Sequence, residues 1–233
     1  NAKKAFKMAE VRWYFIVVIV SAAIITIELC RAAAPFATAL RDSAFQVASI
    51  ITTTGFSTTD FNLWPGTCKT ILVILMFVGA CAGSTGGGMK VSRFVILFKT
   101  VFKELDSYIH PKRIQKLALD GKPIDHDVVR SINVYFITFA VIFVISLFLV
   151  SFEGNDLVTN FTAVAATINN IGPGLELAGP TQNFGLFSML TKYVLMFDML
   201  AGRLELFPLL ILFHPAVWKD LHTTHRNWRR RRQ

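Results

Sequence analysis

Long apolar stretches dominate this chain, and short polar segments separate them. Four of these stretches have the length of a membrane span, because an α-helix needs about 20 largely apolar residues to cross a bilayer. They cover residues 13–29, 68–82 with a continuation over 91–102, 134–151 and 186–213. The pattern predicts an all-α integral membrane protein.

Two further apolar segments, at 40–51 and 157–168, are too short to cross a bilayer. Each is followed by a turn that contains a glycine, Gly55 in the first case and Gly172 in the second. Segments of this length are typical of re-entrant helices, which enter the membrane and return on the same side. Such a helix would point its partly negative C-terminal end at the centre of a pore, where it favours a cation. The alternative is a pair of amphipathic hairpins on the membrane surface.

Carboxylate and hydroxyl side chains near the start of each short segment favour helix capping. We expect Asp42 and Ser43 to cap the first of these helices. Asp156 and Thr159 lie near the start of the second and have the same capacity.

The order of span, short apolar segment, glycine turn and span occurs twice along the chain. Superposing Gly55 on Gly172 brings the two short segments and their turns into register. A repeat of this kind predicts two units with the same architecture. We therefore divide the chain into a first repeat with a cytoplasmic loop, residues 1–126, and a second repeat with a basic tail, residues 127–233.

The glycine turns carry the chemistry of a cation filter. The first turn follows the order of the Thr-Val-Gly-Tyr loops whose backbone carbonyls replace the hydration shell of a potassium ion. Glycine permits the positive φ that turns successive carbonyls toward one axis. The residues expected to offer carbonyl ligands are Thr53, Thr54 and Gly55 in the first repeat and Asn170, Ile171 and Gly172 in the second.

Two such turns cannot close a four-fold ring, so an N-terminal half of the protein or a second copy must complete it. The second turn also has Asn where the potassium-channel loop has Thr, and Pro where it has Tyr. The ring would therefore be asymmetric. A sodium-permeable or sodium-coupled carrier is the alternative to a potassium pathway.

A glycine-rich run interrupts the second predicted span. Each glycine costs about 1 kcal/mol relative to alanine within a helix, so the run predicts a non-helical loop inside the membrane, beneath the filter. A phosphate-binding loop would need Lys where Met89 stands. Close helix packing through Gly79 and Gly83 would need only two small residues. The residues of the predicted loop are Gly83, Ser84, Thr85, Gly86, Gly87 and Gly88.

Charged residues in the fourth predicted span indicate function, because charge is costly inside a bilayer. Lys192 and Arg203 lie 11 positions apart, so a helix places them on nearly the same face. Arg203 either points into the pore against the glycine-rich loop or pairs with Glu205 or Asp198 of a neighbouring helix. Lys192 either faces the pore or extends to the outer interface.

The net charge of +9 is distributed unevenly along the chain. Basic residues gather before the first span, between the second and third, and in the tail, whereas residues 152–185 contain no Lys or Arg. The positive-inside rule therefore places both ends and the 103–130 loop in the cytoplasm. Basic clusters beside spans favour contact with membrane lipid over nucleic acid.

With these segments described, the chain resembles the membrane subunits of bacterial Trk potassium uptake systems, of the TrkH/TrkG type in the Trk/Ktr/HKT superfamily. The resemblance implies that the chain holds the third and fourth of four repeats. Each repeat is a span, a re-entrant pore helix, a filter loop and a span, and together they form a pseudo-four-fold pore like that of a potassium channel. The chain begins on Asn1, so we expect it to be part of a longer polypeptide. The stretches that carry the resemblance are 51–56, 82–90, 169–174, and 192 with 201–205.

The resemblance implies potassium translocation across the bacterial inner membrane, with no enzymatic reaction and K⁺ as the bound ion. It implies that the glycine-rich loop and Arg203 gate the pore. The implied partners are membrane lipid, the N-terminal half of the same protein, a second copy in a homodimer, and a cytoplasmic nucleotide-binding ring of the TrkA type. A non-conducting membrane anchor for a regulatory complex is the alternative from another class, but an anchor would not need the glycines of the filter and the loop.

Overall fold

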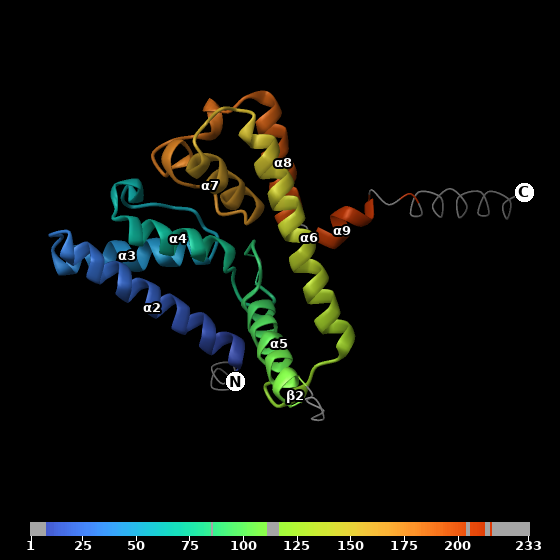
Figure 1. The fold of residues 1–233 in the computed structure, drawn as a ribbon. Coiled ribbons are helices and arrows are strands. Elements are labelled where there is room, and N and C mark those ends of the chain that lie inside the picture. Colours follow the sequence, from blue (N-terminus) through green and yellow to red (C-terminus); the bar gives the residue numbers. More distant parts are fainter. Residues whose placement is uncertain (1–7, 85, 111–116, 204–205, 213–214, 216–233) are drawn as a thin grey trace, which may run out of the picture.

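The computed structural model describes residues 8–84, 86–110, 117–203, 206–212 and 215, and nearly all of its regular structure is helical (Figure 1). The only strands among these residues are β1 (Ala118–Leu119) and β2 (Lys122–Pro123), which pair in an antiparallel hairpin. The α-helices are α2 (Ala9–Arg31), α3 (Phe36–Ile51), α4 (Gly66–Phe77), α5 (Val91–Ile109), α6 (His126–Ser151), α7 (Leu157–Ile168), α8 (Met189–Arg203) and α9 (Leu206–Leu212). The 3₁₀ turns are η1 (Phe61–Leu63), η2 (Glu176–Ala178) and η3 (Phe184–Leu186).

Within the described ranges, α2 and α6 are long and apolar enough to span a membrane, as predicted for the first and third spans. Large apolar side chains on both helices are exposed, which is the pattern of a surface that contacts lipid. These side chains are Trp13, Ile19 and Ile27 on α2, and Ile137, Val144 and Phe148 on α6.

The other two predicted spans are divided. The second is split into α4 and α5 by a non-helical segment, as the glycine-rich run predicts. The fourth, expected as one span over 186–213, is also split, because α8 ends at Arg203 and α9 leads off in another direction (Figure 1). Pro208 gives a physical reason for this correction. Proline has no N–H for the carbonyl four residues earlier, and its ring clashes with that carbonyl in a continuous helix.

The two short helices differ in how they begin. α7 spans Leu157–Ile168 as expected, and the Asp156 carboxylate caps it by accepting the Thr159 amide at 3.1 Å. α3 begins four residues earlier than expected, after Pro35, so Asp42 and Ser43 lie within the helix. Their predicted capping role is therefore wrong. The proline favours an earlier start because its fixed φ suits a helix N-terminus.

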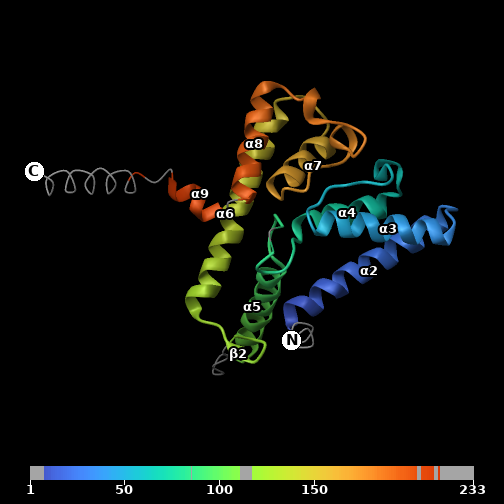
Figure 2. The ribbon, with the colours of Figure 1, turned by 180° about the vertical axis from the view of Figure 1, so that it is seen from behind.

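The chain folds into two halves, α2–α5 and α6–α9, that lie side by side (Figure 1). In both views α3 lies along α4, and α7 lies beside α8 (Figure 2). Phe77 at the end of α4 joins the halves, because its ring contacts Phe139 and Phe143 of α6 and Phe161 of α7, with centroids 5.5–6.3 Å apart. The segment between α4 and α5 lies between the two halves (Figure 1). This arrangement brings the glycine-rich run close to both turns.

Candidate functional site

The turns that follow α3 and α7 share one backbone hydrogen-bond pattern. After α3, the Thr54 amide donates to the carbonyl of Ser49 at 2.9 Å. After α7, the Ile171 amide donates to the carbonyl of Ala166 at 2.8 Å. Both residues of the second pair lie 117 positions after their counterparts, which is the offset that superposes the two glycines. The structure therefore repeats the turn as the sequence predicts.

The same positions in both turns adopt left-handed backbone conformations. Gly55 and Gly172 have φ values of 77° and 111°, as expected for glycine. Thr53 and Asn170, also 117 positions apart, have φ values of 56° and 55°. A positive φ is uncommon for residues other than glycine, and it is strained for a β-branched threonine. Strain of this kind concentrates at sites that bind ligands.

The two turns contact each other through Gly55. A Cβ atom at this position would overlap the carbonyl oxygen of Ile171 and would lie 3.1 Å from the Pro173 ring. Only glycine fits so close to the neighbouring backbone. The turn of the first repeat therefore contacts the turn of the second repeat, at the residues expected to form the filter.

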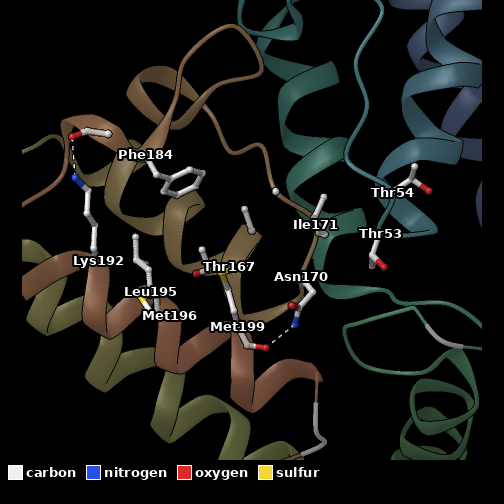
Figure 3. A pocket seen from close by; sticks show the side chains of 13 residues that line it. Thr53, Thr54, Thr167, Asn170, Ile171, Phe184, Lys192, Leu195, Met196 and Met199 are labelled. Atoms are coloured by element: carbon white, nitrogen blue, oxygen red, sulfur yellow. Dashed lines mark hydrogen bonds between the residues drawn. The ribbon is translucent and has the colours of Figure 1, made fainter. Parts of the chain in front are cut away.

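A cavity of about 580 Å³ opens beside these turns (Figure 3). Three side chains of α8, Leu195, Met196 and Met199, form an apolar wall. Lys192 also lines the cavity, and its ammonium donates to the Gly185 carbonyl at 2.9 Å. Five of the six residues expected to offer carbonyls line it as well: Thr53, Thr54, Asn170, Ile171 and Gly172.

The glycine-rich run lies directly against both turns. The Gly87 amide donates to the Thr53 hydroxyl at 3.0 Å. A Cβ atom on Gly87 would overlap the carbonyl oxygen of Asn169. The run folds back on itself, because the Gly79 amide donates to the Met89 carbonyl at 2.8 Å. Gly79 therefore serves this loop and not a helix-packing pair.

The remaining residues of the predicted loop are placed in part. Gly86 lies near the Thr53 hydroxyl, and Gly88 has a φ of 73° and lies near the side-chain oxygen of Asn169. Gly83 has a φ of 83° with open space around it. Thr85 lies outside the described residues.

Two charged side chains that the sequence analysis did not single out hold this loop. Glu10 is 6% exposed, and its carboxylate accepts the Ala82 amide at 2.5 Å and the Ser92 amide at 3.3 Å. The Lys90 ammonium donates to the carbonyls of Ser84 and Gly86 at 3.0 and 2.6 Å. In the sequence, each lies at the edge of an apolar segment. A charged residue at such a position usually marks a solvated helix end, so neither stands out as a loop contact.

Arg203 lies beside the glycine-rich loop. It lines a second cavity, of about 360 Å³, together with Gly83, Ser84, Gly86, Gly88 and the basic side chains of Lys90 and Arg93. Asp198, one of the two partners suggested for Arg203, hydrogen-bonds to Ser146 of α6. Glu205, the other suggested partner, lies outside the described residues.

The helix α8 is fixed against the second turn. Its Met199 carbonyl accepts the side-chain amide of Asn170 at 3.0 Å (Figure 3). A Cβ atom on Gly202 would overlap the carbonyl oxygen of Ile168, so the helix backbone lies close to the end of α7. A hydrogen bond and a close backbone contact therefore join α8 to the second turn and the end of α7.

Polar contacts at the other end of the turns join the two halves. The Asn62 side chain accepts the Glu176 amide at 2.9 Å and donates to the Glu176 carbonyl at 3.2 Å. Lys69 forms an ion pair with the Glu176 carboxylate at 3.5 Å. Glu176 has a φ of 51°, a conformation that the two Asn62 bonds hold. This clamp fixes the second turn against the first repeat.

A carboxylate also holds the start of α8. Glu153 accepts hydrogen bonds from the Thr191 hydroxyl and from the amide and hydroxyl of Ser188, the last two at 2.7 and 2.8 Å. The bonds from Thr191 and then Ser188 lower the pKa of Glu153, because they stabilise its ionised form. The carboxylate thus takes over the capping that the start of a helix requires.

Comparison with known proteins gives one consistent result. The family model TrkH, described as a cation transport protein, matches residues 7–220. The chain is 41% identical to the Trk system potassium uptake protein TrkH of Vibrio parahaemolyticus over 183 residues, which is 78% of this chain and 37% of that protein. It is 34% identical to TrkG of Escherichia coli over 178 residues, or 76% of this chain and 36% of that protein.

A solved structure agrees with the sequence relatives. The crystal structure of the potassium transporter TrkH from Vibrio parahaemolyticus matches with a TM-score of 0.84 and 36% sequence identity. The match covers 91% of this chain and 46% of that chain. The chain thus spans less than half the length of the relatives it matches.

Proposed function

Because the chain belongs to the TrkH family of cation transport proteins, we propose that its two turns form half of a potassium filter. The family is one of membrane transporters and not of enzymes. The chain accordingly has the all-α membrane architecture of these proteins. Its backbone carbonyls at Thr53–Gly55 and Asn170–Gly172 would replace the water of a dehydrating potassium ion.

The single observation that carries this proposal is the contact between the two turns. Turns with the same hydrogen bonds and the same pattern of positive φ meet where Gly55 lies against the Ile171 carbonyl. A membrane anchor would require neither the repeated strain nor a glycine at the contact. We propose that the remaining length of the relatives supplies two more turns and closes a pseudo-four-fold ring.

The glycine-rich loop and Arg203 form the proposed gate. The loop is hydrogen-bonded to Thr53, and Arg203 lines a cavity together with loop residues. A guanidinium on the path of a potassium ion opposes its passage by charge repulsion. Displacement of the loop and Arg203 would therefore open the path.

The location and partners are proposals that follow from the family resemblance and the charge distribution. We place the protein in the bacterial inner membrane with both ends of this segment in the cytoplasm. Membrane lipid surrounds it, a second copy forms a homodimer with it, and a TrkA-type ring contacts its cytoplasmic loops. The named relatives are potassium uptake proteins, which supports potassium as the transported ion.

Rubidium uptake into proteoliposomes tests the proposed ion. We expect the full-length protein to take up rubidium, and we expect external potassium to compete at least about tenfold better than sodium, since potassium and rubidium share the carbonyl filter. Sodium competing as well as potassium would instead support the sodium-permeable carrier, which the departure of the second turn from Thr-Val-Gly-Tyr favours.

A further inference from the structure

A carboxylic acid is buried where two membrane helices meet. Asp198 of α8 is fully buried, at 0% exposure, and Ser146 of α6 is 3% exposed. The Ser146 hydroxyl lies 2.6 Å from one carboxyl oxygen of Asp198. The other carboxyl oxygen is buried and has no hydrogen-bond partner. Neither the filter nor the gate uses this pair.

No described cationic side chain faces Asp198. The helices packed against α8 are α6, α7 and α9, and the described residues of α7 and α9 include none that titrates. The titratable residues of α6 lie at least 11 positions before Ser146, which is about 16 Å along the helix. Those of α8 lie five or six positions from Asp198 and therefore on other faces. These residues are His126, Asp127, Arg130 and Tyr135 on α6, and Lys192, Tyr193 and Arg203 on α8.

An ionised carboxylate in this setting is unfavourable. An isolated buried charge is costly unless it is paired, so such a group binds either a cation or a proton. Hard metal cations take about six oxygen ligands, and this site offers only the carboxyl oxygens and one hydroxyl. A protonated carboxyl carries no charge to compensate, and its O–H can donate to the oxygen of the serine hydroxyl.

We propose that Asp198 is an intramembrane proton-binding site, whose carboxyl holds a proton against Ser146 at the contact between α6 and α8. Loss of this proton leaves an uncompensated charge between the two helices and forces them apart. The backbone carbonyl of the adjacent residue, Met199, accepts a hydrogen bond from the side-chain amide of Asn170. A shift of α8 would therefore move the second turn. The proton site stands on its own geometry, and only its effect on transport rests on the proposed function.

Infrared spectroscopy of the full-length protein in lipid tests the proton site. At neutral pH we expect the C=O stretch of a protonated carboxylic acid, absent in Asp198→Asn and shifted to higher frequency in Ser146→Ala, which removes the hydrogen bond. Asp198→Asn should fold as well as the native protein, because an amide reproduces the neutral acid. A spectrum with no protonated acid that depends on Asp198, or an Asp198→Asn variant that fails to fold while Asp198→Glu folds, would overturn the proposal.

Rubidium uptake at different pH values tests the effect on transport. The native protein should lose uptake at least about threefold as the pH rises from about 6 to about 9, because proton loss disturbs the helix contact. Asp198→Asn should keep its uptake over this range. A native pH dependence that persists in Asp198→Asn would contradict the link to the filter. Absence of rubidium uptake at every pH would refute the proposed function, whereas the infrared result would still decide the proton site.

Discussion

Replacing Gly55 by alanine is expected to reduce rubidium uptake by at least about 100-fold, the loss that a displacement of about 1 Å at a positioned ligand can cause. The added Cβ atom would overlap the Ile171 carbonyl oxygen, which is itself an expected ligand. The φ of 77° adds strain that an L-residue tolerates poorly. Both turns must therefore shift, and the filter loses its geometry. Uptake into proteoliposomes, corrected for the amount of folded protein, measures the effect.

Substitutions at two other glycines separate the effect of the contact from the effect of backbone strain. Gly172 has a φ of 111° but nothing within 4 Å of an added Cβ atom, so Gly172→Ala should be weaker and lower uptake about tenfold, through strain of about 1–3 kcal/mol. Gly66 has open space and no positive φ, so Gly66→Ala should leave uptake unchanged. Uptake by Gly55→Ala equal to that of Gly66→Ala would show that the contact between the turns has no part in transport.

Releasing the glycine-rich loop is expected to raise uptake measured without a cytoplasmic partner. Lys90→Met keeps an unbranched side chain of similar length but removes the ammonium that binds the carbonyls of Ser84 and Gly86. Hydrogen bonds to a charged group contribute roughly 1.5–3 kcal/mol each, so the open population should rise at least about tenfold. The initial rate of rubidium uptake into proteoliposomes measures this change.

The matched control is Lys99, within α5. Lys99 donates to the Ala118 carbonyl of the β1–β2 hairpin at 2.8 Å. Lys99→Met therefore removes an equal charge and should leave the rate near the native value. A rate for Lys90→Met at or below that of Lys99→Met would mean that Lys90 does not hold a closed loop.

Periodicity and glycine placement predicted much of the architecture. The bounds of α7, the break between α4 and α5, and the register of Gly55 with Gly172 are all readable from the sequence, because each depends on local chemistry. The end of α8 was missed because hydropathy is continuous across it. Pro208 was the available signal, since proline disfavours a continuous helix at that point.

The contacts around the site depend on the tertiary fold and were harder to foresee. Glu10 holds the loop from 72 positions away in sequence and has no local motif. The contacts of Lys90 with Ser84 and Gly86 are local, but no motif marks them. The positive φ of Asn170 had a signal, because asparagine adopts this conformation more readily than most residues. No such signal exists for the positive φ of Thr53, because β-branched residues disfavour this conformation. The repeat alone relates the two positions.

The central claim is that the two turns bind one line of potassium ions, and a crystal of the full-length protein grown with rubidium tests it most directly. We predict anomalous difference peaks between the carbonyl oxygens of Thr53–Gly55 and those of Asn170–Gly172, and we predict their loss in Gly55→Ala. An ordered filter region with no rubidium between the two turns would contradict the account.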